Sequence, residues 1–218
     1  MSTKDPRQTE FASHEHSAGI MMPSVRVSHL RPFAAGWTRQ CFVHPDEPTR
    51  CIKITRPDAT DDDNQTEWQY RQSLHRRGVP IAAAGLTRCY GWIRTDRGPG
   101  LQFDLIREPD GRIASSVDAW LATNGRRRPA LSDAFTDLRR RMADHRIIMR
   151  DARLSNVVVQ SKADGSIELW VVDGLGDRDA RAFASRFCWS ARWRQSRLFE
   201  RHGWSEALTH PVEQRVAP

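Results

Sequence analysis

One polar loop and the hairpin predicted after it constrain the fold of this chain more than any other stretch. The loop contains Asp151 and Asn156, five positions apart, and the β-branched run Val157–Val159 follows at once. A turn at residues 162–165 leads into a return strand that ends in a second acid, Asp173. Strands rich in β-branched residues fix the direction of the side chains at their ends, so we expect the two acids and the amide to converge.

Two carboxylates and one amide suit phosphoryl transfer. Catalysis of that reaction is mostly positioning and neutralisation of charge, so a protein needs one carboxylate near the accepting hydroxyl and further oxygen ligands for Mg²⁺. Asp151 can be the first, and Asn156 and Asp173 can be the ligands. The spacing Asp-x-x-x-x-Asn resembles the catalytic loop of protein kinases, which often has a basic residue facing the phosphate two positions after the acid; here that residue is Arg153.

Composition excludes several other classes of protein. The 218 residues, 39% of them hydrophobic, are enough for one ample core or two small lobes. No run approaches the roughly 20 apolar residues of a membrane span, and residues 1–16 lack the apolar stretch of a secretory signal, which predicts a cytoplasmic protein. The four cysteines, at positions 41, 51, 89 and 188, do not have metal-ligand spacing and are predicted to be structural.

Lysine is rare in this basic chain, which draws attention to one lysine in a strand-like run. The net charge is +7, yet only Lys4, Lys53 and Lys162 are lysines. Lys53 lies in the run Arg50–Ile54, beneath a turn that contains Gly36. Its ammonium could reach nucleotide phosphates as a compact point charge. The alternative is an ordinary strand lysine whose stem covers apolar surface.

An acid on the next helix is the candidate partner of Lys53. Residues Thr66–Leu74 are predicted to be helical and follow the acidic run Asp61–Asn64, which favours a helix N-terminus. Glu67 lies in the first turns of this helix, and we expect it to hold the Lys53 ammonium in place. The alternative is that Glu67 is merely a helix acid exposed to solvent.

The region from about Val25 to Glu108 is predicted to form a small, mainly antiparallel β lobe. Strand-like runs are expected at residues 25–30, 40–43, 50–54, 89–93 and 101–106. Arg107–Gly111 then breaks the pattern and is predicted to form a hinge. Backbone N–H and C=O groups there, with Ile106 and Glu108 as the candidates, could pair with the edge of an adenine. The alternative is an ordinary turn.

The region from Pro109 to Glu206 is predicted to form a reduced, mainly helical lobe. Helices are expected at residues 117–123, 131–144 and 181–202. The last is rich in arginine and aromatic residues, which suits a membrane surface or a nucleic acid; the alternative is a terminal helix that packs its aromatics on the lobe. The remaining segments are residues 1–24, expected to be disordered, and a tail at 207–218.

The order of these features resembles the protein-kinase-like fold: a hairpin with glycine, Ile-Lys, a helix Glu, a hinge, Asp-x-x-x-x-Asn and Asp-Gly. From about Leu30 to Arg194 the chain also looks like the bacterial PhoP regulatory network protein YrbL family. The segments that carry this likeness are Cys41–Pro45, Cys51–Lys53, Leu105–Arg107 and Val172–Gly176. The resemblance implies an α+β fold of two lobes that binds ATP and Mg²⁺ and transfers the γ-phosphate to a hydroxyl of an unknown acceptor, a small molecule or a protein.

Carried over residue by residue, the resemblance implies specific roles in the site. It implies Lys53 and Glu67 as the ion pair on the phosphates, Asp151 as the catalytic base, and Asn156 and Asp173 as the ligands of Mg²⁺.

The chain also departs from protein kinases. Its turn has the single glycine Gly36 where kinases have three, and Met149 stands where kinases have His. Gly174 follows Asp173 without the Phe of kinases, and no Ala-Pro-Glu comes after it. Only 45 residues follow Asp173, too few for a peptide platform, so a small acceptor is plausible.

Two other classes of function stay open. One is a pseudokinase, a regulator that binds nucleotide or a partner protein; the missing glycines favour it, and the retained acids, amide and Lys53 oppose it. The other is a basic nucleic-acid-binding module, which ranks last. A steep loss of binding with salt would identify it.

Overall fold

A computed structural model of the chain describes residues 24–59, 63–124, 128–176 and 197–209. They form a mixed α+β structure with mainly antiparallel strand pairs. The chain divides into two compact units. The first contains the described parts of Met1–Asn64 and Cys89–Phe103, and the second those of Gln65–Arg88 and Asp104–Pro218. The predicted division into lobes after Glu108 stays a prediction.

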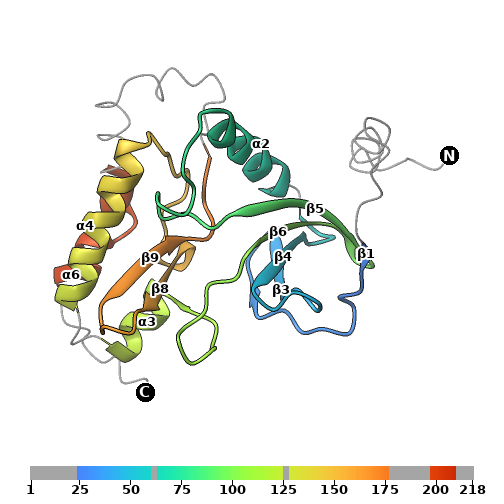
Figure 1. Ribbon diagram of the computed structural model, residues 1–218, viewed down its shortest axis with the longest axis horizontal. Coiled ribbons are helices and arrows are strands. Elements are labelled where there is room, and N and C mark those ends of the chain that lie inside the picture. The colour runs from blue at the N-terminus through green and yellow to red at the C-terminus, as the bar shows by residue number, and fades with distance from the viewer. Residues whose placement is uncertain (1–23, 60–62, 125–127, 177–196, 210–218) are drawn as a thin grey trace. The chain divides into compact units, whose positions relative to one another are not determined.

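The first unit is built on a six-stranded sheet in the order β1-β5-β6-β4-β3-β2 (Figure 1). Its strands are β1 (Ser24–Val25), β2 (Ala34–Ala35), β3 (Arg39–Val43), β4 (Arg50–Thr55), β5 (Cys89–Thr95) and β6 (Gly98–Asp104). β3 and β4 form one antiparallel hairpin and β5 and β6 another, while β1 runs parallel to β5. The strands predicted at residues 40–43, 50–54 and 89–93 are confirmed. The strand predicted at 101–106 is confirmed up to Asp104.

Apolar side chains from these strands make the core of the first unit. Phe42 and Ile52, which are partners across the β3–β4 hairpin, are both fully buried. Ile93 of β5 belongs to the same cluster. Gly100 of β6 allows the strands to pack closely, because a Cβ there would lie 2.5 Å from the Ile52 side chain.

The strand predicted at residues 25–30 is wrong beyond Val25. The N–H groups of Val27 and Ser28 donate to the Asp96 carboxylate at 2.8 and 3.2 Å. Leu30 N–H donates to Val27 C=O at 3.0 Å, which turns the chain. Asp96, in the β5–β6 turn, thus takes the donors that a neighbouring strand would have used.

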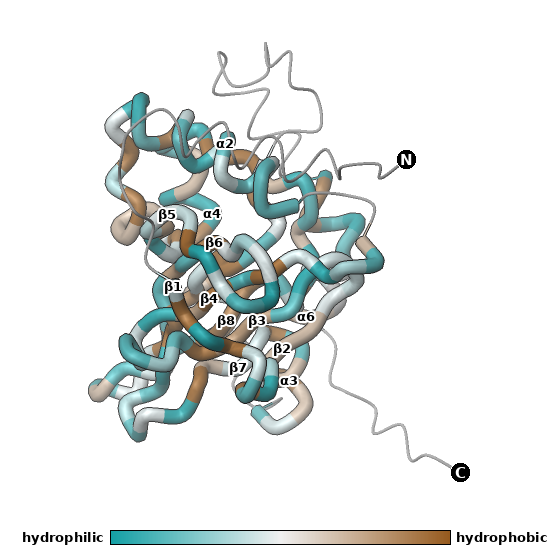
Figure 2. The backbone as a smooth tube through the Cα atoms, turned by 90° about the vertical axis from the view of Figure 1, so that its right-hand side faces the viewer, coloured by the Kyte–Doolittle hydropathy of each residue, from teal (hydrophilic) through white to brown (hydrophobic). Residues whose placement is uncertain are grey.

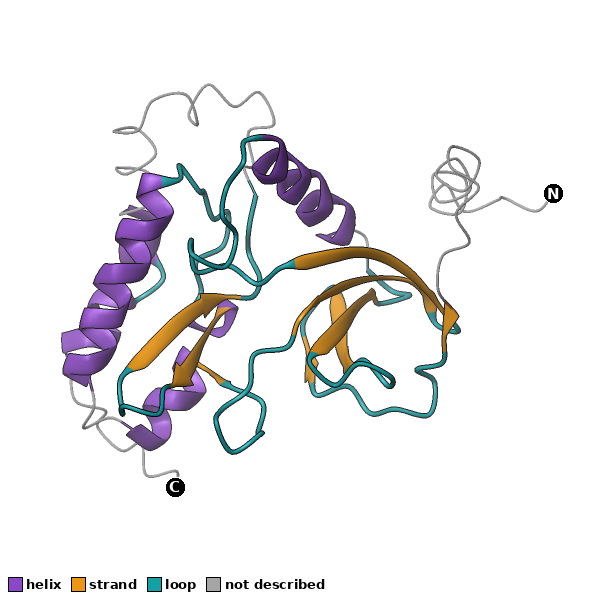
Figure 3. Ribbon diagram, in the orientation of Figure 1, coloured by secondary structure: helices purple, strands orange, loops and turns teal. Residues whose placement is uncertain are grey.

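The second unit contains a three-stranded antiparallel sheet and the helices around it (Figure 3). The strands are β7 (Ser115–Ser116), β8 (Val157–Ser161) and β9 (Ile167–Val171), in that order across the sheet. The helices are α2 (Asp63–Arg76), whose first two residues belong to the first unit, α3 (Val117–Asn124), α4 (Arg128–Asp144) and α6 (Trp204–Thr209). α4 packs on β9 and α6 (Figure 1).

Alternation along the β8–β9 hairpin explains how this sheet buries one face. Val157 and Val159 of β8 and Leu169 and Val171 of β9 are fully buried. They join Leu138 and other apolar residues of the helices in one core. The predicted hairpin and the helices predicted at 66–74, 117–123 and 131–144 are therefore confirmed.

The predicted helix at 181–202 lies mostly outside the described residues, as does Cys188. Residues 197–201 are helical, a turn follows at 202–203, and α6 begins at Trp204. The Phe199 ring is buried and meets the Phe135 ring edge-on at 5.0 Å. Packing on the second unit, the alternative weighed for this segment, thus holds for Phe199. The terminal segments 1–23 and 210–218 are also outside the described residues.

The described helices fall short of a membrane span in length or in hydropathy. None of them is both long enough and apolar enough for a span. In Figure 2 the tube along α2 is mostly hydrophilic, with isolated hydrophobic positions. A cytoplasmic location stays a prediction.

Candidate functional site

The loop before β8 and the segment after β9 are joined in the second unit by backbone hydrogen bonds. Asp151 N–H donates to Gly174 C=O at 3.2 Å. Val172 N–H and Asp173 N–H donate to Asn156 C=O at 3.0 and 3.3 Å. The structure therefore places Asp151, Asn156 and Asp173 on segments that contact one another.

Gly174 is the point of closest approach between these segments. Its φ is +77°, and a Cβ there would lie 2.1 Å from the Asp151 carbonyl oxygen and 2.8 Å from the Asn156 amide nitrogen. Its N–H also donates to the side chain of Asp173 at 2.6 Å. The loop in this conformation leaves no room for a side chain at position 174, where protein kinases have Phe.

Asn156 ends a short 3-10 turn, η2 (Leu154–Asn156), and its side chain faces the loop. The side-chain amide nitrogen donates to Asp151 C=O at 3.1 Å. Its side-chain oxygen is then the atom that a metal ion could take. Within the described ranges, no group of three or more His, Cys, Asp or Glu side chains is placed to hold a metal. One amide and one carboxylate, Asp173, suit Mg²⁺, which commonly takes its other ligands from phosphates and water.

The Asp151 carboxylate is held mainly by Arg153. The Arg153 Nε and Nη2 atoms lie 2.8 and 2.6 Å from Asp151 Oδ2. His202 Nε2 lies 3.9 Å from the other oxygen, Oδ1. Partial burial raises the pKa of Asp151, but the hydrogen bonds and charge of Arg153 outweigh it, with a smaller contribution from Asn156, so the pKa lies below the ordinary value. Asp151 is therefore ionised at neutral pH.

A tryptophan from α6 supports the same loop. Trp204 is 1% exposed, and its indole N–H donates to Ala152 C=O at 2.7 Å. Its ring stacks on Phe135 of α4 at 4.2 Å. Sequence reasoning missed Trp204, because no local pattern connects it with a loop 52 positions earlier.

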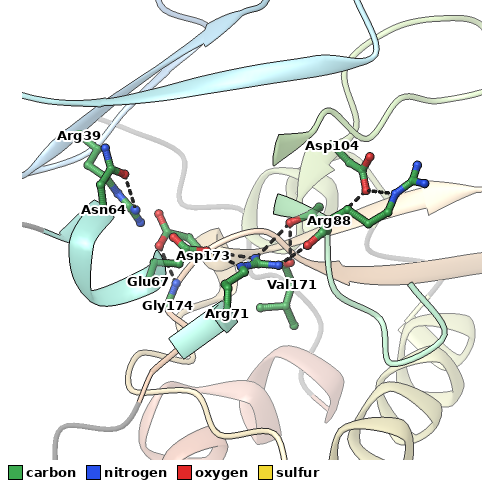
Figure 4. Close-up of polar contacts among 10 residues, drawn as sticks. Arg39, Asn64, Glu67, Arg71, Arg88, Asp104, Val171, Asp173 and Gly174 are labelled. Atoms are coloured by element: carbon green, nitrogen blue, oxygen red, sulfur yellow. Dashed lines mark hydrogen bonds and ion pairs between the residues drawn. The ribbon is translucent and has the colours of Figure 1, made fainter. Parts of the chain in front are cut away.

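Glu67 forms a buried ion pair on α2. Two nitrogens of Arg71, one turn later, donate to Glu67 Oε1 at 3.0 and 3.3 Å (Figure 4). Glu67 is 2% exposed, so it is not a helix acid exposed to solvent. Its predicted pairing with Lys53 stays a prediction. Sequence reasoning missed Arg71, although the spacing of four residues from Glu67 is a recognised signal for a pair on one helix face.

Lys53 is buried within the first unit. Its ammonium lies 4.3 Å from the centre of the Phe103 ring, where the face of the ring attracts a cation. Its carbonyl accepts a hydrogen bond from the Asn64 side chain at 2.9 Å, and Asn64 in turn accepts one from Arg39 at 3.1 Å (Figure 4). The Gly36 turn is closed by a hydrogen bond from its N–H to Arg39 C=O at 2.8 Å.

The residues predicted to form a hinge are engaged in hydrogen bonds within their own segment and with β8. Ile106 C=O accepts from Ala114 N–H at 3.0 Å, and Glu108 N–H donates to Arg112 C=O at 2.8 Å. The Glu108 carboxylate accepts from Ser161 N–H at 3.1 Å. Contacts of Ile106 and Glu108 with adenine stay a prediction, and they would have to share or replace these bonds.

Comparisons with known proteins cover nearly the whole chain. The sequence model of the family described as PhoP regulatory network protein YrbL matches residues 25–203. A protein named YrbL from Escherichia coli strain K12 is 26% identical over 198 residues, which cover 89% of this chain and 93% of that protein. A YrbL protein from Shigella flexneri matches with the same identity and coverage. The matched range contains all the predicted site residues, from Gly36 to Asp173.

Proposed function

This chain belongs to the PhoP regulatory network protein YrbL family, and from that premise we propose that it is a phosphotransferase with a two-lobed, protein-kinase-like fold. In this proposal ATP and Mg²⁺ bind, and the γ-phosphate passes to a hydroxyl of a small molecule or a protein. The family description also supports a regulatory role.

The observation that carries the proposal is the joining of the Asp151, Asn156 and Asp173 segments by backbone hydrogen bonds. The site thereby offers one ionised carboxylate for the acceptor and a separate pair of oxygen ligands for a metal. Phosphoryl transfer requires both roles, one group that orients the acceptor and others that hold the metal ion.

Asp151 orients the acceptor in this mechanism. Its lowered pKa keeps it ionised and makes it a weak base, so it first aligns the hydroxyl. It would take the proton as the hydroxyl oxygen bonds to the γ-phosphorus and the bond from that phosphorus to the bridging oxygen breaks, releasing ADP. Asn156 and Asp173 would hold Mg²⁺, which supplies positive charge to the phosphate oxygens. Arg153 would exchange its bond with Asp151 for a phosphate oxygen.

The remaining site residues would bind the nucleotide. We assign Lys53, steadied by Glu67, to the phosphates, and the turn at Gly36 to covering them. Ile106 and Glu108 would approach the adenine edge through backbone atoms.

The second candidate is a pseudokinase that binds nucleotide or a partner without transferring phosphate. The close pair between Arg153 and Asp151 favours it, because Arg153 occupies a carboxylate oxygen that a base would need. Nucleic-acid binding is the third candidate and rests on the net charge of +7 and on the arginines and aromatic residues of segment 181–202. A membrane contact through residues 181–202 also stays a prediction.

Thermal unfolding with and without ATP and Mg²⁺ tests the proposal. A ligand that binds only the folded state stabilises it and so raises the melting temperature. At a ligand concentration 100 times the dissociation constant the gain in stability is about 2.7 kcal/mol. We expect a rise that requires Mg²⁺ in the wild type and is lost in Asp173→Ala. Asp133→Ala, which removes an exposed acid of α4, is the matched control and should keep the rise.

Transfer is then measured separately from binding. Asp151→Asn should keep the thermal response and lower phosphate transfer from ATP by about 10²-fold or more. A thermal response with no transfer in the wild type would favour the pseudokinase. No response at millimolar ATP would contradict the phosphotransferase and favour a pseudokinase that binds a partner protein. Nucleic-acid binding that falls steeply with salt would instead favour the third candidate.

A further inference from the structure

A buried arginine of α2 has no role in the mechanism above. Arg71 is 4% exposed and lies one turn after Glu67. Burying a guanidinium is costly unless its charge and its donors are satisfied, and a buried ion pair is weak evidence of a gain in stability. A gain in stability therefore does not explain why the Arg71 guanidinium is buried.

The Arg71 guanidinium joins two different segments of the second unit (Figure 4). On one side it donates twice to Glu67 of its own helix. On the other side Nη1 donates to Thr87 C=O and Nη2 to Thr87 Oγ1, the latter at 3.3 Å. A planar fork with five donors can make these bonds together, whereas a lysine ammonium at the same place is a single point charge.

Thr87 in turn contacts β9, the strand that precedes Asp173. Thr87 N–H and Oγ1 donate to Val171 C=O at 3.3 and 3.4 Å. Val171 N–H donates to Gly85 C=O at 2.8 Å. Val171 is the last residue of β9, and Asp173 follows two positions later. These contacts thus run from Glu67 of α2 to Val171, and the chain itself leads from Val171 to the proposed metal ligand Asp173.

We propose that Arg71 is a positioning residue for the metal side of the site. It fixes the Thr87 segment on α2 and, through Thr87, fixes the end of β9, so that the Asp173 carboxylate is held where the metal binds. The inference rests on the proposed function and adds to it a residue that touches neither nucleotide nor metal.

The variant Arg71→Lys tests this role. It keeps a positive charge beside Glu67 but cannot also hold Thr87. We expect the free Mg²⁺ concentration that gives half of the ATP-induced rise in melting temperature to increase at least tenfold. A merely structural role for Arg71 would lower the melting temperature at every Mg²⁺ concentration without moving this half-point.

Two further variants serve as a control and as a milder test. Arg88→Lys is the matched control, because Arg88 is adjacent to Thr87 but exposed and pairs with Asp104 at 3.1 Å (Figure 4). Its half-point should stay within twofold of the wild type. Thr87→Val removes only the hydroxyl that bonds to Arg71 and Val171, so a smaller increase, of about threefold, is expected. It also serves as the test if Arg71→Lys does not fold.

The outcomes separate this inference from the function on which it rests. A wild type without a Mg²⁺-dependent response would overturn both. A normal wild-type response, with the half-points of Arg71→Lys and Thr87→Val unchanged, would overturn only the positioning role of Arg71. An equal increase in Arg88→Lys would also overturn it.

Discussion

Gly174 combines a left-handed backbone with contact on its Cβ side. Gly165, in the β8–β9 turn, is a suitable comparison. Its φ is also positive, at +82°, but a Cβ at this position would have no atom within 4 Å. Gly174, with φ +77°, faces the backbone of the Asp151 loop. The two positions therefore separate the cost of backbone conformation from the cost of a clash inside the candidate site.

Gly174→Ala should lose much more stability than Gly165→Ala. Left-handed backbone costs a residue with a Cβ about 1–2 kcal/mol, which applies to both. Only Gly174→Ala adds a clash with packed backbone, worth about 1–3 kcal/mol. The free energy of unfolding in urea measures the difference. Equal losses would show that the loop moves aside without cost, and that the contact at Gly174 does not hold the site.

α6 is the element that connects the Asp151 loop with the helical core. Its first residue, Trp204, lies between a stacked Phe135 ring and the Ala152 carbonyl. A phenylalanine at 204 could keep the stack but would leave that carbonyl without its donor. The effect of the hydrogen bond can therefore be measured apart from the packing.

Trp204→Phe should lower the free energy of unfolding by about 1–3 kcal/mol, the cost of an unpaired buried polar group. Trp170→Phe is the matched control, because that indole donates to the partly buried Gln160 side chain at 3.0 Å, which can turn to water. Denaturant titration of both variants measures the contrast. A loss in Trp170→Phe as large as that in Trp204→Phe would contradict a specific role for the Ala152 contact.

Elements with a local pattern could be predicted from the sequence, and long-range contacts could not. The β-branched run Val157–Val159 and the turn at Gly165 make the β8–β9 hairpin visible in the sequence. Nothing local shows that Asp96 takes the donors of Val27 and Ser28, 69 and 68 positions away. The Arg71–Thr87 contact was missed for the same reason.

In the candidate site, too, some features could be predicted from the sequence and others could not. Asp151, Asn156 and Asp173 could be placed together because the hairpin joins their segments. Arg153 was expected to face phosphate, and its bond with Asp151 could not be foreseen, because a basic residue two positions after an acid does not by itself show which anion it contacts. Gly174 was visible only as a departure from kinases, and its close approach to the Asp151 loop became visible only in the structure.

The Asp151 carboxylate contributes to the response of the whole molecule to acid. The pKa of an aspartate in an unfolded chain is about 3.9, and that of Asp151 in the folded protein is lower. A carboxyl with a lowered pKa stabilises the fold above the unfolded value, and the contribution is lost as pH falls through the folded value. The affected window therefore lies below about pH 4–5.

Arg153→Gln should move acid unfolding to higher pH. Without the guanidinium the pKa of Asp151 rises toward its ordinary value, so its stabilising contribution shrinks. Circular dichroism during acid titration gives the midpoint. In an Asp151→Asn background the same Arg153→Gln change should leave the midpoint in place, because the titrating carboxyl is gone. A shift of equal size in both backgrounds would show that Arg153 acts through another group.

The bond from Trp204 to Ala152 spans 52 residues, and this separation governs when the site can be completed during synthesis. A ribosome makes the Asp151 loop and the β8–β9 hairpin before it reaches α6. The nascent chain therefore carries its acids and amide on a loop that still has no donor for the Ala152 carbonyl and no ring stacked on Phe135. Completion of the site therefore has to wait for the synthesis of α6 and is coupled to the folding of the second unit.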